Sequence, residues 1–217
     1  MTGLTLSVGD RRVGAIYNKV AEPIATLVFG HGAGGDMHHR TMKAISEAFS
    51  EMGIAMLRFN FPFKEDGRTR VDSRAVSTAT VKAAVEFAIA NYRMPLFLGG
   101  HSFGGRMASH AVVDYELNVD GMIFCSFPLH PRGKPSTARA DHLVAIKRPM
   151  LFLSGTRDAL ADPDLLGPMV TVVGARLQWL ETANHGYSVL KRTRRRQDDV
   201  FEEMAGYARD FVVSVTS

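Results

Sequence analysis

The chain has little of what disulfide-linked or metal-binding proteins require. Only one cysteine, Cys125, stands among its 217 residues, which excludes an internal disulfide and suits a reducing compartment. Because residues 122–124 before it are apolar, we expect this thiol to be a buried core group rather than a nucleophile. The eight histidines form no cluster with cysteine, so the sequence gives no reason to expect a metal ion.

Long apolar runs are also lacking. No stretch approaches the ~18 consecutive apolar residues that span a bilayer, and residues 1–10 hold no basic segment followed by an apolar one. We therefore expect a cytoplasmic protein that does not enter membranes. At 217 residues and 46% hydrophobic content, the chain can bury a substantial core, and one domain over residues 1–217 is the natural expectation.

Charge is only mildly unbalanced, with a formal net charge of +4. A basic run, residues 191–196, permits an anionic ligand nearby, although most such runs are solvated loop or helix faces. Specific nucleic-acid binding is not expected, because interleaved aromatic residues and a recognition motif are absent.

What the chain does contain is a regular alternation of short apolar runs and helical stripes. Residues 4–8 and 13–17 flank a Gly-Asp turn and predict an opening antiparallel hairpin. The runs at 27–29, 54–59, 96–99, 122–125, 150–153 and 176–180 are typical of strands covered on both faces. The pattern predicts an α/β fold with a mostly parallel, doubly wound sheet.

Helices are predicted between these strands from apolar positions spaced three or four residues apart. The stripes are Met42, Ile45, Phe49 and Met52; then Ala75, Ala79, Ala83, Phe87 and Ala90; and at the end Val200, Met204, Tyr207 and Phe211. A further helix is expected from residue 106 to 117.

The most informative segment is residues 96–105, in which an apolar strand enters Gly-His-Ser-Phe-Gly and a helix leaves it. This layout is that of a nucleophile elbow, a sharp turn that holds Ser102 up as an exposed hydroxyl. Glycines two residues before and after it remove the Cβ atoms that would collide in such a turn. Gly-x-Ser-x-Gly alone also occurs in ordinary glycine-rich loops. Whether Ser102 is a nucleophile therefore depends on finding residues that can activate it.

Those partners follow in the chain order that this turn requires, an acid and then a histidine. Asp158 comes just after the predicted strand 150–153, at the edge where ligands gather in parallel sheets. His185 lies in the loop after the last predicted strand. We predict that His185 is the base that activates Ser102 and that Asp158 orients the imidazole. His101 points in a different direction from its neighbour and is expected to pack or hydrogen-bond beneath the elbow.

An oxyanion site is expected from the loop after the early strand, residues 31–35, His-Gly-Ala-Gly-Gly. The predicted donors are the backbone N–H groups of Ala33 and Phe103, with His31 bracing the loop. The alternative for this loop is phosphate binding, but it has neither the Lys-Ser/Thr ending of a P-loop nor Gly-x-Gly-x-x-Gly spacing.

With these motifs the sequence resembles the α/β-hydrolase superfamily over nearly its whole length. It looks most like the small, lidless dienelactone-hydrolase type and the testis-expressed hydrolase-like group, partly through residues 58–62, Arg-Phe-Asn-Phe-Pro, and 130–133, His-Pro-Arg-Gly. True dienelactone hydrolases carry a cysteine where this chain has Ser102. The resemblance implies an α/β-hydrolase fold with an N-terminal antiparallel hairpin and no sizeable lid.

The region where lids are commonly inserted is short and polar here. Residues 127–141 are rich in Pro, Arg, Lys and His and cannot form a bulky apolar cap, so we expect an open site for small, soluble substrates. Candidate substrate contacts are His31, Phe61, Arg106, His130, Arg132 and Tyr187. For the phenylalanine, core packing is an equal alternative, and for Arg106 a surface ion pair.

Taken together, the residues favour a serine hydrolase that cleaves a small carboxylic ester, thioester or lactone through an acyl-enzyme and needs no cofactor. The ligand expected is a small acyl substrate, with an anionic one permitted by the charge. The alternative is a non-catalytic binding or scaffolding protein on the same fold, because fold alone does not settle function. The sequence leaves open the substrate, the acyl length and whether the chain forms a homo-oligomer.

Overall fold

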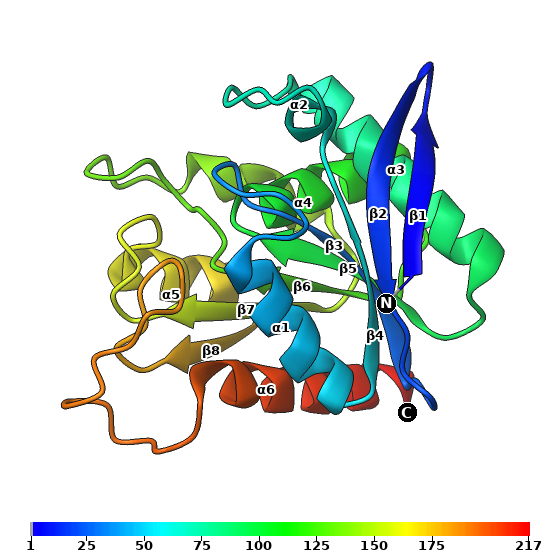
Figure 1. Ribbon diagram of the computed structural model, residues 1–217. Helices are drawn as coiled ribbons and strands as arrows, with labels where there is room; N and C mark the ends of the chain where they lie inside the picture. Colours follow the sequence, from blue (N-terminus) through cyan, green and yellow to red (C-terminus); the bar gives the residue numbers. More distant parts are fainter. Residues whose placement is uncertain (1) are drawn as a thin grey trace.

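A single eight-stranded sheet runs through the protein between two layers of helices (Figure 1). The structure, a computed structural model, describes residues 2–217. Its strands are β1 (Thr2–Val8), β2 (Arg11–Asn18), β3 (Ala25–Gly30), β4 (Ile54–Phe59), β5 (Leu96–His101), β6 (Gly121–Cys125), β7 (Met150–Gly155) and β8 (Arg176–Leu180). They lie in the order β1-β2-β4-β3-β5-β6-β7-β8.

The sheet is mostly parallel. β1 pairs with β2 as an antiparallel hairpin and β2 is antiparallel to β4, whereas β4, β3, β5, β6, β7 and β8 are mutually parallel. The expected doubly wound sheet with an N-terminal hairpin is confirmed. Because all six parallel strands end at the same edge, the loops that follow them meet there, which is where open α/β sheets place their ligands.

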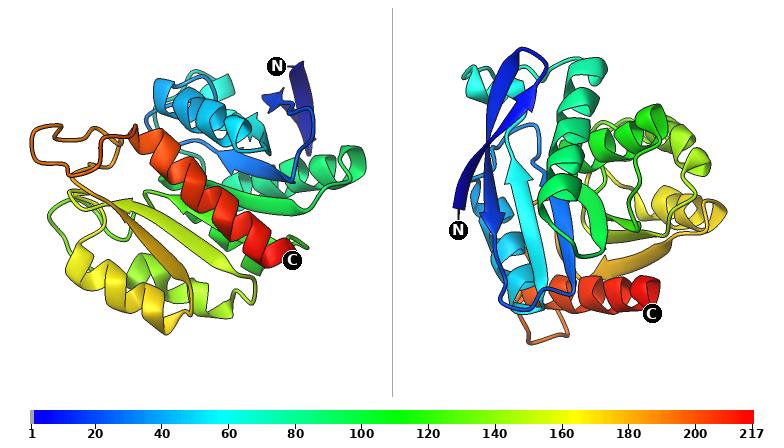
Figure 2. Two further views of the ribbon diagram at one scale, coloured as in Figure 1. Left: turned by 90° about the horizontal axis from the view of Figure 1, so that it is seen from below. Right: turned by 90° about the vertical axis from the view of Figure 1, so that its right-hand side faces the viewer.

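Helices cover both faces of the sheet, as Figures 1 and 2 show. They are α1 (Arg40–Glu51), α2 (Pro62–Glu65), α3 (Arg74–Asn91), α4 (Phe103–Tyr115), the 3-10 helix η1 (Ala138–Ala145), α5 (Pro163–Val172) and α6 (Val200–Thr216). One core cluster joins one sheet face to α1 and α6, and the other joins the opposite face to α3, α4, η1 and α5. Cys125 is fully buried in the first of these, and burial raises the pKa of its thiol to about 12.

The predicted contact face of α3 is wrong, although the helix itself exists. The side chains that face the core are Ser77, Thr78, Thr80, Val81, Ala84, Val85 and Ala88, whereas Ala75 and Ala90 are exposed. Small hydroxyl residues can face the sheet because they bond back to the helix, as when Thr80 Oγ1 donates to the Val76 carbonyl at 2.9 Å. Such residues are invisible to a search for apolar stripes.

Among the described residues, no helix combines the length and the hydropathy of a membrane-crossing segment. The connection from β6 to β7 consists of a loop, η1 and a short return to the sheet, so no helical cap stands over the carboxyl edge there. Two short helices, α2 and η1, were not expected from the sequence, since neither is long enough to show a clear period.

Candidate active site

Ser102 stands at the turn between β5 and α4 in a strained backbone conformation. Its φ is 52° and its ψ −116°, a region that non-glycine residues avoid and that costs about 1–3 kcal/mol. The turn fits only because glycines flank it. A Cβ on Gly104 would lie 2.1 Å from the Gly30 carbonyl oxygen, and one on Gly100 would lie 2.5 Å from the Gly105 nitrogen. The surrounding backbone therefore fixes the serine at the carboxyl edge of the sheet.

Asp158 is presented by the turn that follows β7. Its N–H donates to the Gly155 carbonyl at 3.1 Å, and the Arg157 N–H before it donates to Ala183 at 2.9 Å, which ties this turn to the loop after β8. The carboxyl side chain is completely buried, and its Oδ1 accepts from the Leu160 N–H at 2.8 Å. A buried carboxylate needs a partner to offset its desolvation.

His185 is that partner, and it also reaches the serine. Its Nδ1 lies 2.8 and 2.9 Å from the two Asp158 carboxyl oxygens, and its Nε2 lies 2.8 Å from Ser102 Oγ. Because an ionised carboxylate can only accept, the proton sits on Nδ1 and the Nε2 lone pair faces the serine hydroxyl. The three residues predicted from chain order are brought together, in the arrangement that activates a serine nucleophile.

Two residues that sequence reasoning did not assign to this role hold the histidine in place. Asn184 Oδ1 accepts from the N–H groups of Gly186 and Ser188, each at 3.0 Å, which closes the loop around His185. His101 Nε2 lies 3.0 Å from the His185 carbonyl oxygen and donates to it. Burial lowers the pKa of His101 to about 4, so it stays neutral at pH 7. Asparagine is common in such turns, so the position of Asn184 directly before His185 was the signal in the sequence that could have indicated this role.

The loop after β3 lies against the elbow, where the second oxyanion donor was expected. An ideal Cβ on Gly32 would lie 3.6 Å from Ser102 Cβ, so this loop passes directly beside the serine. Ala33, the next residue, is exposed, and Phe103 is the first residue of α4, whose leading N–H groups have no partner within the helix. Their role as oxyanion donors stays a prediction.

His31 braces this loop as predicted, since its Nδ1 donates to the Gly32 carbonyl at 2.8 Å and its Nε2 accepts from the Phe61 N–H at 3.1 Å. Burial lowers the pKa of His31 to about 4. His130 repeats the arrangement, with Nδ1 on the Pro131 carbonyl at 2.9 Å and Nε2 on the Asp162 N–H at 3.0 Å. Both imidazoles therefore hold two backbone segments together.

The structure corrects several of the predicted substrate contacts. His31 and Phe61 have no exposed surface, Tyr187 exposes 2% and His130 3%, so these side chains are packing groups rather than surface groups above Ser102. Tyr187 donates its hydroxyl to the Leu153 carbonyl at 3.1 Å, and Phe61 packs among aromatic rings. Of the predicted set, Arg132 is exposed and Arg106 is half-buried.

The basic run at residues 191–196 is largely neutralised within the protein. Arg194 is buried and contacts Glu203 of α6 at 2.5 Å, while Arg195 pairs with Glu181 at 2.9 Å and Arg196 with Asp198 at 2.5 Å. These pairs fasten the segment after His185 to α6 and to the end of β8. The run is therefore mainly an anchor for the histidine loop, which its composition alone could not distinguish from a free cationic patch.

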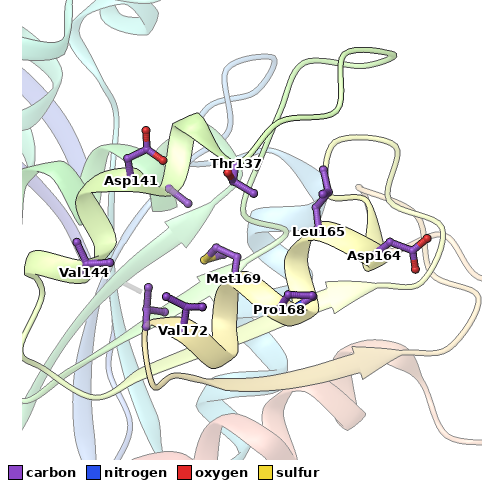
Figure 3. A pocket seen from close by; sticks show the side chains of 10 residues that line it. Thr137, Asp141, Val144, Asp164, Leu165, Pro168, Met169 and Val172 are labelled. Atoms are coloured by element: carbon purple, nitrogen blue, oxygen red, sulfur yellow. The ribbon is translucent and has the colours of Figure 1, made fainter.

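A separate apolar pocket of about 340 Å³ lies between η1 and α5 (Figure 3). Ala140 and Val144 line it from η1, and Leu165, Met169 and Val172 line it from α5. Neither Ser102, Asp158 nor His185 belongs to its lining, so the pocket and the serine–histidine contact are different places.

Comparison with known proteins agrees with the fold. The sequence model of a family described as alpha/beta hydrolase domain matches residues 23–213. A lidless α/β serine hydrolase from Xanthomonas campestris is similar in structure, with 20% sequence identity, a TM-score of 0.75, and coverage of 98% of this chain and 94% of that one.

Two further solved structures have the same fold. Dienelactone hydrolase from Anabaena variabilis matches with 16% identity and a TM-score of 0.75, over 98% of this chain and 96% of its own. Est1E from Butyrivibrio proteoclasticus, bound to ferulic acid, matches with 15% identity and a TM-score of 0.78, over 98% and 99%. Since the family match spans most of the sequence and the expected α/β-hydrolase resemblance is thereby confirmed, this chain belongs to the alpha/beta hydrolase family.

Proposed function

We propose that the protein is a serine hydrolase that cleaves a small carboxylic ester, thioester or lactone through an acyl-enzyme. The observation that carries this proposal is the continuous set of contacts from Asp158 through His185 to Ser102 Oγ, each between 2.8 and 2.9 Å. Membership of the hydrolase family and the likeness to esterase folds support the same class of reaction.

In the acylation step, Ser102 Oγ attacks the carbonyl carbon while its proton passes to His185 Nε2. The buried Asp158 carboxylate stabilises the imidazolium that forms. The carbonyl oxygen becomes an oxyanion, for which we assign the N–H groups of Ala33 and Phe103 as donors. Loss of one such donor typically raises the barrier by ~3 kcal/mol. The imidazolium then gives its proton to the leaving group, and the acyl-enzyme remains.

In the deacylation step a water molecule takes the place of the leaving group. His185 removes a proton from the water, the hydroxide adds to the acyl carbon, and the proton returns to Ser102 Oγ as the acid leaves. With 27% of the His185 side chain exposed and no helical cap over this edge, water can reach the imidazole. This openness favours small, soluble acyl groups over long apolar ones.

The test combines fluorophosphonate labelling with turnover of p-nitrophenyl acetate by wild type and Ser102→Ala. We expect the wild type to be labelled on Ser102 and to release p-nitrophenol, and the variant to do neither. An unlabelled, inactive wild type that retains a stoichiometric partner through purification would favour the scaffolding alternative. Full activity in Ser102→Ala would contradict the assigned nucleophile.

A further inference from the structure

Two turns beyond the serine, α4 carries a second group of polar side chains that the proposed reaction does not use. His110 of α4 stacks on His142 of η1, with ring centroids 3.6 Å apart and planes 18° from parallel. Ser109 Oγ lies 2.7 Å from His142 Nε2 and donates its own hydrogen to the Arg106 carbonyl at 2.8 Å. A hydroxyl has one hydrogen, so His142 Nε2 donates to the serine.

The charged neighbours of this histidine pair are Arg74, Arg106 and Asp114, and Arg139 lies near Arg106. Arg106 and Arg139 form no ion pair with any carboxylate in residues 2–217, and Arg139 reaches only the Pro128 carbonyl, at 3.5 Å. Arg74 at the start of α3 is the exception, since it pairs with Asp114 of α4. The cluster therefore carries about two positive charges that nothing in the described chain balances.

Two buried polar atoms of the cluster also lack partners within the described residues. They are Nε of Arg106 and Nδ1 of His110. Leaving a buried donor unsatisfied commonly costs about 1–3 kcal/mol, more for a charged group. Arg106 as a whole residue is half-buried.

The cluster extends along α4 away from Ser102. Arg106 is in the first turn of α4, and its N–H donates to the Ser102 carbonyl at 3.1 Å, which places these two residues one helical turn apart. Ser109 and His110 follow in the second turn of the same helix, and Arg139 and His142 are contributed by η1. Arg106 is therefore the member of the cluster that lies next to the nucleophile.

We propose that Arg106, Arg139 and the stacked His110–His142 pair form a binding site for a dianionic oxyanion of the phosphate type. Two uncompensated guanidinium groups match the charge of a phosphoryl group, whereas a single carboxylate would leave one charge unbalanced. We call these four residues the arginine–histidine site.

The pKa values of the two histidines reflect burial and the positive charges around them. Burial first, and then the charges of Arg74 and Arg106, lower the pKa of both His110 and His142 to about 4; His110 adds to the shift at His142, and Asp114 opposes it at both. A bound dianion would neutralise those arginines, so it should raise both pKa values. Binding and protonation of the pair are therefore linked.

The first experiment measures binding directly, with inorganic phosphate titrated into the wild-type protein and the imidazole NMR signals of His110 and His142 followed. We expect a saturable shift and a higher pKa for both rings with phosphate bound. Arg106→Gln and Arg139→Gln should each weaken binding by about tenfold or more, the loss expected for one charge-assisted contact.

Arg93→Gln is the matched control, because Arg93 is exposed and lies before β5, at the opposite edge of the sheet. It changes net charge equally but should leave phosphate affinity unchanged. Absence of a saturable shift in the wild type overturns the proposal, and so does equal weakening by the Arg93 and Arg106 substitutions. Since Arg139→Gln changes a residue outside the elbow helix, a folding defect in Arg106→Gln would not remove the test.

A second experiment identifies where the anion comes from, and it rests on the proposed function. p-Nitrophenyl acetate is compared with the p-nitrophenyl ester of phosphonoacetic acid. If the site holds the substrate's own phosphoryl group, phosphate competes with the second ester, and Arg106→Gln lowers kcat/KM for that ester about tenfold more than for the acetate. If the anion is a separate effector, phosphate changes acetate turnover without such a preference. Failure to hydrolyse either ester would contradict the proposed function and leave the binding result to decide the site.

Discussion

Two serine–histidine contacts lie along the same helix, and they differ in what stands behind the imidazole. At the N-cap of α4, His185 Nε2 is 2.8 Å from Ser102 Oγ, and two turns further along His142 Nε2 is 2.7 Å from Ser109 Oγ. The distances are nearly equal. The far nitrogen of His185, however, meets the buried Asp158 carboxylate, whereas the ring of His142 faces a second imidazole and arginines.

That difference determines what each pair can do. A carboxylate fixes the proton on the far nitrogen and stabilises the imidazolium, so the near nitrogen can accept from serine. Arginines oppose protonation of His142, and there the imidazole donates to Ser109, which is itself fully buried within α4. Serine–histidine proximity is thus not sufficient for nucleophilic catalysis. The charge behind the imidazole decides, and of the two serines Ser102 exposes 9% and Ser109 none.

The strongest test of the difference between the two serine–histidine contacts is to remove each serine hydroxyl separately. Ser102→Ala should lower kcat for p-nitrophenyl acetate by about 10⁵-fold or more, because the acyl-enzyme cannot form. Ser109→Ala should keep that activity and lose only about 1 kcal/mol of unfolding free energy, for the hydrogen bonds it makes. Comparable loss of activity in the two variants would mean that the second contact takes part in the chemistry.

The two carboxylates provide the next comparison. Asp158→Asn should lower kcat by about 10⁴-fold, since an amide donor at this position favours the wrong imidazole tautomer. Asp114→Asn should leave kcat unchanged, because Asp114 is partly exposed and pairs with Arg74 on the surface. It should also tighten phosphate binding at the arginine–histidine site by removing a carboxylate that offsets the positive charge there. Steady-state kinetics of both variants, with circular dichroism to confirm folding, checks this.

The active-site residues were predictable from the sequence because each of them is identified by residues that lie close to it along the chain. The glycine spacing around Ser102 reflects close backbone packing, because a Cβ added at Gly100 or Gly104 would lie less than 3 Å from a neighbouring backbone atom. Asp158 and His185 each follow a strand whose apolar run is unmistakable, and parallel strands bring their ends to one edge. Asp162 and Asp199 act as the N-caps of α5 and α6, a position at which aspartate is a preferred residue.

What could not be predicted depends on neighbours that are distant in sequence. The basic run at 191–196 is neutralised by Glu181, Asp198 and Glu203, and composition does not say which acids will meet it. The stacked histidines come from α4 and η1, 32 positions apart, and η1 is too short to be recognised by its period. The buried substrate candidates were misplaced because aromatic and histidine side chains suit both a pocket and a core.

The smallest effect we expect is on the free energy of unfolding at acidic pH. It depends on the buried histidines of the two sites. His31, His101, His110 and His142 all have pKa values lowered to about 4, with burial as the first cause. In the unfolded chain they titrate near 6.5, so between about pH 6.5 and 4 the unfolded state binds more protons. Stability should therefore fall as pH falls through this window.

His110→Phe keeps an aromatic ring against His142 but removes one titrating group. The variant should take up about one proton fewer on unfolding at pH 5, so its free energy of unfolding should decline less steeply from pH 7 to 5 than that of the wild type. Urea unfolding at several pH values measures the slope. An unchanged slope would show that His110 is protonated as easily in the folded protein as in the unfolded chain, which would also remove the electrostatic contrast between the arginine–histidine site and the carboxylate-backed pair at Ser102.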